Sequence, residues 1–441
     1  MKQQIDRILA RGLASLALIL TIAQVSFGYS VLAHEAIIDS TWDGSIKPLL
    51  LKRFQGLSPE QLREAHSYAY GGAIIQDMGY YPFGSKFFTD LVHYVRSGDF
   101  IENLILESQD ANEYAFALGA LAHYAADNDG HAIGVNRAVP LLYPKLRQKY
   151  GSEVTYVEGP SAHIQTEFGF DVVQVARGRY RPDAYHEFIG FRVSKEVLQR
   201  AFNKTYNIEM KDIFTNLDLS IATYRRSVST IIPEMTKVAW ETKKDDISKA
   251  APEMTRDKFV YGLTRADYEK EWGNEYEKPS VVNKVTAFML RVVPKVGPFK
   301  ALSFKPPTPE AERMFLASFD ATLERYRRML VQASGGTLDL ENRDFDTGKP
   351  TRAGEYRLAD ETYAKLLDKL ASNHFQNVAP DLRQNILAFY ADPSAPIATK
   401  EKSDEWRKTL RKLEELRAVP NVSASQTREV NAPVRRRPRQ R

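Results

Sequence analysis

The segment NEYAFALGALAHYAADNDGHA, residues 112–132, restricts the fold of this chain more than any other stretch. Its apolar residues recur at helical spacing, which predicts a largely apolar helix. His123, Asp127 and His131 follow one another at intervals of four residues. Because four residues turn an α-helix by only about 40° beyond a full turn, these side chains form a slowly winding line on one side. Such a line is compatible with a metal site, and also with a helix that holds histidines in its core.

The same helical periodicity recurs along the chain and predicts an all-α fold. Residues 58–79 start with Ser58 as N-cap and Pro59 in the first turn. Thr308 and Pro309 stand in the same way before a second long pattern. Further amphipathic helices are expected over residues 212–244, 308–334, 357–372 and 403–418. The best strand pattern, EVTYVEG at 153–159, is short.

The composition restricts which kinds of site the chain can build. Cysteine is absent, which excludes disulfides and cysteine-based zinc sites. Any metal must therefore bind through histidine, carboxylate or backbone groups. The formal net charge of +5 is too small to indicate nucleic-acid binding by itself. Most of the eight histidines precede residue 164, and these are His34, His66, His93, His123, His131 and His163.

The N-terminus has the pattern of a secretory signal peptide, which we assign to residues 1–28. Basic residues at the start precede an apolar run from Gly12 to Gly28, and small residues near Gly28 suit cleavage there. The alternative is an uncleaved membrane anchor, for which the run is short. An exported protein without disulfides is expected in the bacterial periplasm or outside the cell.

Changes in composition divide the chain after the predicted signal peptide into three segments. We predict a first helical domain over 29–245, a helical C-terminal region over 246–415 and a disordered basic tail over 416–441. The Pro-rich stretch at 292–307 carries several lysines, and either contacts a membrane surface or packs as a linker. The tail either contacts anionic lipid or nucleic acid or is simply solvated.

Other candidate ligands lie outside the opening segment. His163 and Glu167 are four residues apart, a spacing that suits ligands of one metal ion. Asp77 follows an apolar run, where a buried carboxylate is costly unless it is paired or metal-bound. His93 lies in an amphipathic segment, and His34 follows the predicted cleavage site closely.

Taken in order, these residues resemble the zinc-dependent phospholipase C family over roughly residues 29–240. The family is related to the N-terminal domain of glycosylphosphatidylinositol-specific phospholipase D and, more distantly, to fungal single-strand nucleases. The matching positions are His34, Asp77, His93, His123 with Asp127, His131, and His163 with Glu167. The four-residue step from Asp127 to His131 resembles the phospholipase D-type variant, whereas the bacterial phospholipases C and the nucleases have a longer step. Glu167 resembles the phospholipases C, because the nucleases carry Asp at that position. Both features favour the lipid-cleaving branch over the nucleases.

The resemblance implies a helical catalytic domain with two to three Zn²⁺ ions. One ion is expected between Asp77, His93, His123 and Asp127. A second shares Asp127 and takes His34 with the amino and carbonyl groups of Tyr29, the expected mature N-terminus. A third takes His131, His163 and Glu167. Asp77 corresponds to the aspartate that acts as general base. The family carries Trp at its N-terminus, so Tyr29 departs from the pattern.

The resulting expectation is an exported zinc-dependent phosphodiesterase that hydrolyses phospholipids. Two alternatives stay open, a nuclease or nucleotidase with the same zinc site and a non-catalytic zinc- or lipid-binding protein. Near the ligands, aromatic residues either wall a headgroup pocket or simply pack, and these are Tyr80, Tyr81, Phe83 and Tyr94. His66, His186 and His374 match no motif position and are interpreted as structural or surface residues.

Overall fold

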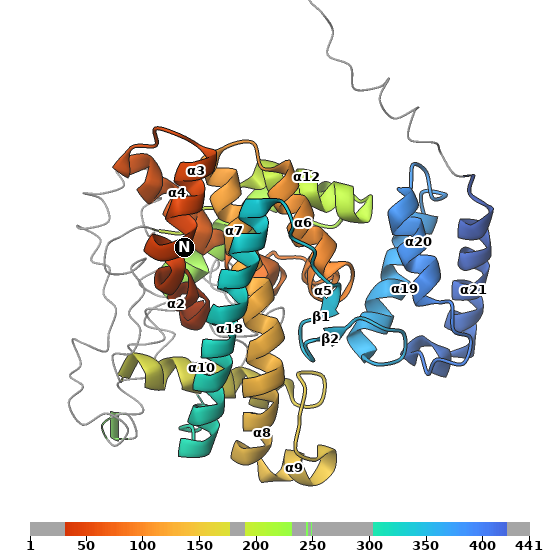
Figure 1. Ribbon diagram of the computed structural model, residues 1–441. Helices are drawn as coiled ribbons and strands as arrows, with labels where there is room; N and C mark the ends of the chain where they lie inside the picture. The colour runs from red at the N-terminus through yellow and green to blue at the C-terminus, as the bar shows by residue number, and fades with distance from the viewer. Residues whose placement is uncertain (1–30, 177–189, 232–243, 246–247, 249–302, 421–441) are drawn as a thin grey trace, which may run out of the picture.

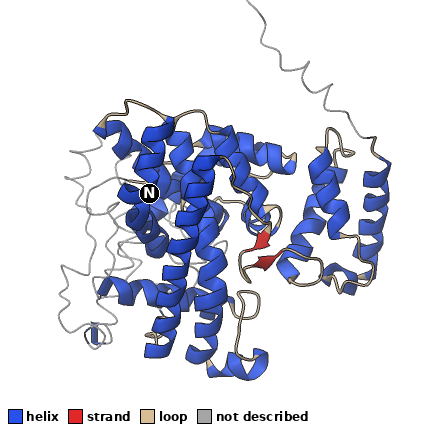
Figure 2. Ribbon diagram, in the orientation of Figure 1, coloured by secondary structure: helices blue, strands red, loops and turns tan. Residues whose placement is uncertain are grey.

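The computed structural model describes residues 31–176, 190–231, 244–245, 248 and 303–420. This part of the chain is predominantly helical, as the sequence predicts (Figures 1 and 2). In the N-terminal half the helices are α2 (Val31–Thr41), α3 (Lys47–Arg53), α4 (Pro59–Gly72), α5 (Lys86–Tyr94), α6 (Ser97–Glu107), α7 (Ala111–Asp129), α8 (Asn136–Leu142), α9 (Pro144–Tyr150), α10 (Pro160–Ala176), α12 (Lys195–Tyr206) and α13 (Leu217–Arg226). Towards the C-terminus follow α18 (Pro309–Gly335), α19 (Arg357–Ala371), α20 (Pro380–Phe389) and α21 (Ser403–Ala418).

Short π- and 3-10-helical turns link several of these helices. The π-helical turns are η1 (Trp42–Ile46), η3 (Gly130–Val135) and η5 (Ser227–Ile231), and the 3-10 turns are η2 (Ile75–Tyr80), η4 (Met210–Asp212) and η8 (Ala398–Glu401). Among the described residues no helix is long and apolar enough to cross a lipid bilayer.

Helix α7 forms the centre of the larger helical body (Figure 1). Asp110 caps its N-terminus, because the Asp110 carboxylate accepts hydrogen bonds from the backbone of Asn112 and Glu113, each at 2.9 Å. The helix is buried on all sides from Glu113 to Asp129, as its apolar sequence predicts. Helices α2, α3, α4, α6 and α18 surround it.

Glycines allow α4 and α7 to pack with their backbones in close contact. A Cβ atom at Gly119 of α7 would lie 2.1 Å from the carbonyl oxygen of Ala69 in α4. A Cβ atom at Gly72 of α4 would lie 2.0 Å from the carbonyl oxygen of Phe116 in α7. Any side chain at either position would force the helices apart. The contact places the segment after α4 directly beside the His123 side of α7.

Helix α18 comes from the predicted C-terminal region and packs along α7 (Figure 1). Thr308 caps it and Pro309 is its first residue, as predicted. Arg325 forms a two-pronged ion pair with Asp129 at 2.7 and 2.8 Å, and the Tyr326 hydroxyl donates to the Leu118 carbonyl at 2.8 Å. The domain boundary after residue 245 stays a prediction, since most residues between 246 and 302 lie outside the described ones.

Helices α19, α20 and α21 form a smaller group beside α5 (Figure 1). It contains a stacked aromatic pair, Tyr363 and Phe389, with ring centroids 3.7 Å apart. Arg96 joins the two groups through an ion pair with Asp381 at 2.5 Å. Helix α21 continues to Ala418, slightly beyond the predicted start of the basic tail. Residues 421–441 lie outside the described part.

The alternating pattern at residues 153–159 forms no strand, which agrees with the all-α prediction. That segment forms turns, and the Val154 N–H donates to the Asn136 carbonyl at 2.9 Å instead of to a neighbouring strand. Among the described residues the strands are β1 (Arg343–Asp344) and β2 (Lys349–Pro350), an antiparallel pair (Figure 2). Two residues per strand are too few for an alternating pattern to show.

Candidate metal centre

Six helical elements bring eight of the predicted site residues to one buried region. His34 comes from α2, Asp77 from η2 and His93 from α5. Helix α7 supplies His123 and Asp127, and its π-helical continuation η3 supplies His131. His163 and Glu167 come from α10. Every one of these side chains is at most 3% exposed. The remaining candidate, Tyr29, lies outside the described residues.

Asp127 stands between the ligands that come from different helices. Its Oδ1 atom lies 3.5 Å from His34 Nε2. Its Oδ2 atom lies 3.1 Å from His123 Nε2 and 3.6 Å from His93 Nε2. Each carboxylate oxygen therefore faces a different histidine group, as a carboxylate that bridges two metal ions must.

Asp77 completes the first group of ligands. Its Oδ1 atom lies 3.3 Å from His93 Nε2. Asp77, His93 and His123 can place ligand atoms within 4.8 Å of one another, and so can His34, His123 and Asp127. The fold thus brings together residues that lie up to about a hundred positions apart in the sequence. They form two adjoining groups, each of which could hold a metal ion.

His131, His163 and Glu167 form a third group with ligand atoms within the same distance. Glu167 Oε1 lies 2.7 Å from His163 Nδ1 and 3.7 Å from His131 Nε2. His131 reaches this group from η3, where the helix widens from α to π geometry at Gly130. The wider turn changes the helical phase, so His131 does not continue the line of His123 and Asp127 as an ideal α-helix would place it.

Backbone carbonyls orient three of the imidazole rings. His93 Nδ1 donates to the Thr89 carbonyl at 2.9 Å, and His123 Nδ1 donates to the Ala73 carbonyl at 2.9 Å. His131 Nδ1 donates to the Phe345 carbonyl at 2.8 Å. A carbonyl accepts only, so each ring carries its proton on Nδ1 and directs Nε2 into the centre. Metal-binding histidines are held in this way in proteins.

The centre contains buried polar atoms that no protein group satisfies. Both oxygens of Asp77 and of Asp127, Nε2 of His123 and of His131, and Oε2 of Glu167 form no hydrogen bond of good geometry. An unsatisfied buried polar atom costs about 1–3 kcal/mol, and more if it is charged. Nitrogen and carboxylate oxygen are the ligand atoms that zinc takes in the absence of thiolates. The donor set therefore fits divalent zinc.

The electrostatics of the centre follow from burial and from the proximity of opposite charges. Burial lowers the pKa of His34 to about 3 and raises the pKa of Asp77. Burial also opposes charge on His93, but the carboxylates of Asp127 and Asp77 outweigh it and raise the pKa of His93 to about 10. Glu167 and Asp127 likewise raise the pKa of His131 to about 10 against its burial. A cation that binds here must displace these protons.

The aromatic residues near the ligands differ in their exposure. Tyr80, Tyr81 and Tyr94 are buried, which supports the packing interpretation for these three. Phe83 is 53% exposed and has a left-handed backbone with φ of 64°. His66 is stacked between Trp42 and Tyr70, in agreement with a structural role. His374 lies on the surface, and His186 lies outside the described residues.

Three residues around the third group are not among the candidates that the sequence predicts. Asn136 accepts from His163 Nε2 at 2.8 Å, while Phe345 and Asp346 lie against His131. None of them belongs to a ligand motif, and Phe345 acts through its backbone carbonyl. Only spatial proximity reveals them.

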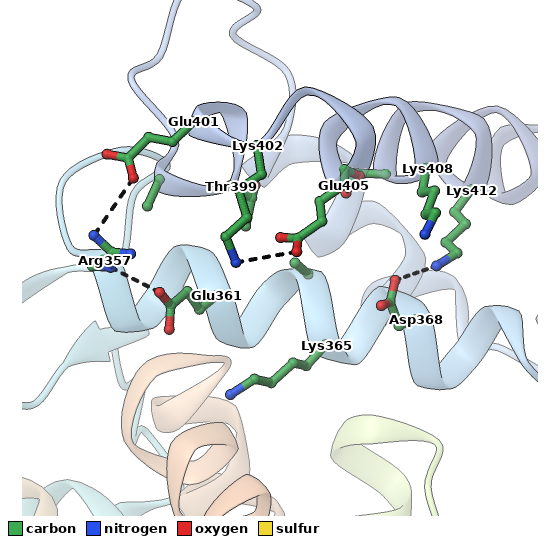
Figure 3. A pocket seen from close by; sticks show the side chains of 13 residues that line it. Arg357, Glu361, Lys365, Asp368, Thr399, Glu401, Lys402, Glu405, Lys408 and Lys412 are labelled. Atoms are coloured by element: carbon green, nitrogen blue, oxygen red, sulfur yellow. Dashed lines mark hydrogen bonds and ion pairs between the residues drawn. The ribbon is translucent and has the colours of Figure 1, made fainter.

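A hollow of about 470 Å³ between α19 and α21 provides a contrast (Figure 3). Its side chains neutralise one another through ion pairs, such as Arg357 with Glu361 at 2.9 Å and Lys412 with Asp368 at 2.5 Å. These groups are substantially exposed, and solvent screens such pairs strongly. The hollow therefore lacks the convergent, unsatisfied groups that the buried centre has.

Comparison with known proteins agrees with this geometry. No curated protein and no solved structure shows significant similarity to the chain. The model of one protein family, described as zinc dependent phospholipase C, matches residues 33–216. This range contains the eight described candidate ligands. Residues 33–216 of the chain therefore belong to the zinc-dependent phospholipase C family, a family of hydrolases.

Proposed function

We propose that the protein is an exported, zinc-dependent phosphodiesterase that hydrolyses phospholipids. The observation that carries this proposal is the buried centre, in which Asp127 directs one oxygen to His34 and the other to His93 and His123. The third group, with His131, His163 and Glu167, adjoins it. The family match covers all of these residues.

The chain itself has two tasks in this reaction. Its carboxylates and imidazoles hold two to three Zn²⁺ ions, which would offset the charge of a phosphodiester and make an attacking water more acidic. Asp77 is the proposed general base: its two oxygens carry no hydrogen bond of good geometry, and its burial raises its pKa, which makes its carboxylate a stronger base.

Export follows from the predicted signal peptide, residues 1–28, which lies outside the described residues. Cleavage after Gly28 would leave the amino group of Tyr29 close in sequence to His34, at the start of α2. N-terminal sequencing of secreted protein tests this step. We expect Tyr29 as the first residue, whereas retention of Met1 would contradict both export by cleavage and the proposed role of Tyr29.

The activity is tested on vesicles of phosphatidylcholine and, in parallel, on single-stranded DNA. We expect release of phosphorylated headgroup from the vesicles, its loss on treatment with a chelator and its recovery when zinc is returned. Cleavage of DNA alone would assign the protein to the nucleases. If neither substrate is cleaved by zinc-loaded protein, the enzyme proposal is wrong and a binding function is left.

A pair of variants separates catalysis from folding. Asp77→Asn should lower the turnover rate strongly, since the amide cannot accept a proton. Asp129→Asn is the matched control, because Asp129 is also a buried aspartate next to the centre in sequence but pairs with Arg325 of α18. Equal activity of Asp77→Asn and the wild type, with zinc bound in both, would remove Asp77 from the mechanism.

A further inference from the structure

A segment from outside the family match forms one wall of the metal centre. Strand β1 and the two residues after it lie against α5 and α6. The Ser97 hydroxyl holds β1 by donating to the Arg343 carbonyl at 2.6 Å. The Phe345 N–H donates to the carbonyl of His93, a candidate ligand, at 3.2 Å. The Phe345 ring is fully buried against the rings of His93 and His123.

Two consecutive carbonyls of this segment orient both histidines of the third ligand group. The Phe345 carbonyl accepts from His131 Nδ1 at 2.8 Å. The next carbonyl, that of Asp346, accepts from Asn136 Nδ2 at 2.7 Å. The Oδ1 atom of the same Asn136 side chain lies 2.8 Å from His163 Nε2. With Nε2 held in this way, the other ring nitrogen of His163 is the one that faces Glu167, at 2.7 Å.

The Asp346 carboxylate adds a charge to this arrangement. Its Oδ1 atom lies 3.7 Å from His131 Nδ1. Its Oδ2 atom accepts from the hydroxyls of Tyr94, at 2.9 Å, and of Tyr356. The carboxylate is therefore buried and held in place. A negative charge beside the protonated nitrogen of a ligating imidazole makes the opposite nitrogen a better metal ligand.

We propose that Asn136 and Asp346 are positioning residues for the third metal, and that the chain beyond the family match is needed to assemble that site. The proposal rests on the proposed zinc function. It concerns metal binding alone, so it is tested without turnover. If wild-type protein binds zinc but cleaves no phosphodiester, the enzyme proposal fails and this inference stands.

The first test compares substitutions at Asn136 in the full chain. Asn136→Leu keeps the branched shape of the side chain but removes both hydrogen bonds. Loss of a residue that hydrogen-bonds a metal ligand weakens metal affinity by about 10- to 100-fold. We expect this loss for the third ion, while the other ions stay bound. Asn136→Asp keeps an oxygen acceptor for His163 Nε2 and should retain more of the affinity. Asn103→Leu is the control, because Asn103 bonds Thr205 on α12, away from the centre.

The second test removes the charge of Asp346. Asp346→Asn keeps the size and an oxygen that accepts from a tyrosine. We expect about a tenfold weaker binding of the third ion, with the other ions unaffected. Asp344→Asn is a matched change in the same segment, where the Asp344 carboxylate bonds Thr347 instead of the tyrosine pair. It should have the smaller effect.

The measurements are zinc titration against a chromophoric chelator, elemental analysis, and the visible absorption spectrum of the Co²⁺-loaded protein. A spectral change in the Asn136 and Asp346 variants shows a changed ligand environment. A purely structural role would lower thermal stability and leave metal affinity and spectrum as in the wild type, and this result would overturn the proposal. If Asn136→Leu does not fold, the Asn136→Asp and Asp346→Asn variants decide by the same criteria.

Discussion

Replacement of Gly119 by alanine tests how the fold positions the metal centre. A Cβ atom at Gly119 would lie 2.1 Å from the Ala69 carbonyl oxygen and 2.9 Å from the Ala73 nitrogen. Ordinary contact starts at 3.4 Å, so α4 and α7 must separate by about 1.3 Å at this point. Both atoms belong to backbone and have no rotamer to which they can move away.

The expected cost follows from this overlap. Overpacking costs about 1–3 kcal/mol, and a clash between two backbones belongs at the upper end of that range. Alanine is about 1 kcal/mol more favourable than glycine inside a helix, and this difference offsets part of the cost. We therefore expect Gly119→Ala to lower the free energy of unfolding by about 2 kcal/mol. Denaturant unfolding in the presence of a chelator measures the effect without a contribution from bound metal.

A glycine-to-alanine substitution at an open position should instead raise the free energy of unfolding. At Gly335, in the last turn of α18, the nearest atom to a Cβ would be the Thr337 hydroxyl at 3.6 Å. Gly335→Ala should therefore stabilise the protein by about 0.4–1 kcal/mol. Gly119→Ala should also weaken zinc binding, because Ala73, whose carbonyl accepts from His123 Nδ1, moves with α4. A Gly119→Ala protein as stable as the wild type would refute the close packing of these helices.

Three further predictions concern the centre and its surroundings. Asp127→Ala should lose more than one zinc ion in elemental analysis, because Asp127 faces both histidine groups; Asp129→Asn should keep all of them, and loss of none in Asp127→Ala would contradict the bridging role. Zinc affinity should rise with pH up to about 10 in competition titrations, because His93 and His131, whose pKa values are raised to about 10, hold protons below that pH which the metal must displace. A pH-independent affinity between 6 and 9 would show that those rings are already neutral. Phe83→Gly should raise the free energy of unfolding by roughly 0.5–1 kcal/mol, because glycine adopts the left-handed backbone at φ of 64° without the penalty of a side chain. A loss of stability in thermal unfolding would mean that the half-exposed ring contributes more than its backbone strain costs.

The helical architecture and most of the candidate ligands can be predicted from local patterns. Helix α7 and the cap of α18 by Thr308 and Pro309 follow from apolar spacing and capping chemistry, which act within a few residues. The four-residue spacing of His163 and Glu167 predicts that both side chains lie on one face, because any α-helix brings residues one turn apart together. The family pattern added His34, which has no local signature of metal binding, and supported Asp77, whose local signature is a carboxylate that follows an apolar run. The alternating pattern at 153–159 forms no strand, because alternation over a few residues does not ensure a partner strand.

The sequence by itself determined the helical class, the residues able to bind zinc and the absence of thiolate ligands, because these depend on side-chain chemistry and on near neighbours in the chain. Tertiary structure alone decided that the π-turn at Gly130 diverts His131 to the third group, and that carbonyls of Ala73 and Phe345 orient His123 and His131. Every residue carries a carbonyl, so no sequence signal marks the one that will accept a ligand's proton. The packing of segments distant in the chain makes that choice. It places residues 343–346 of the C-terminal region against a centre whose described candidate ligands all come earlier in the chain.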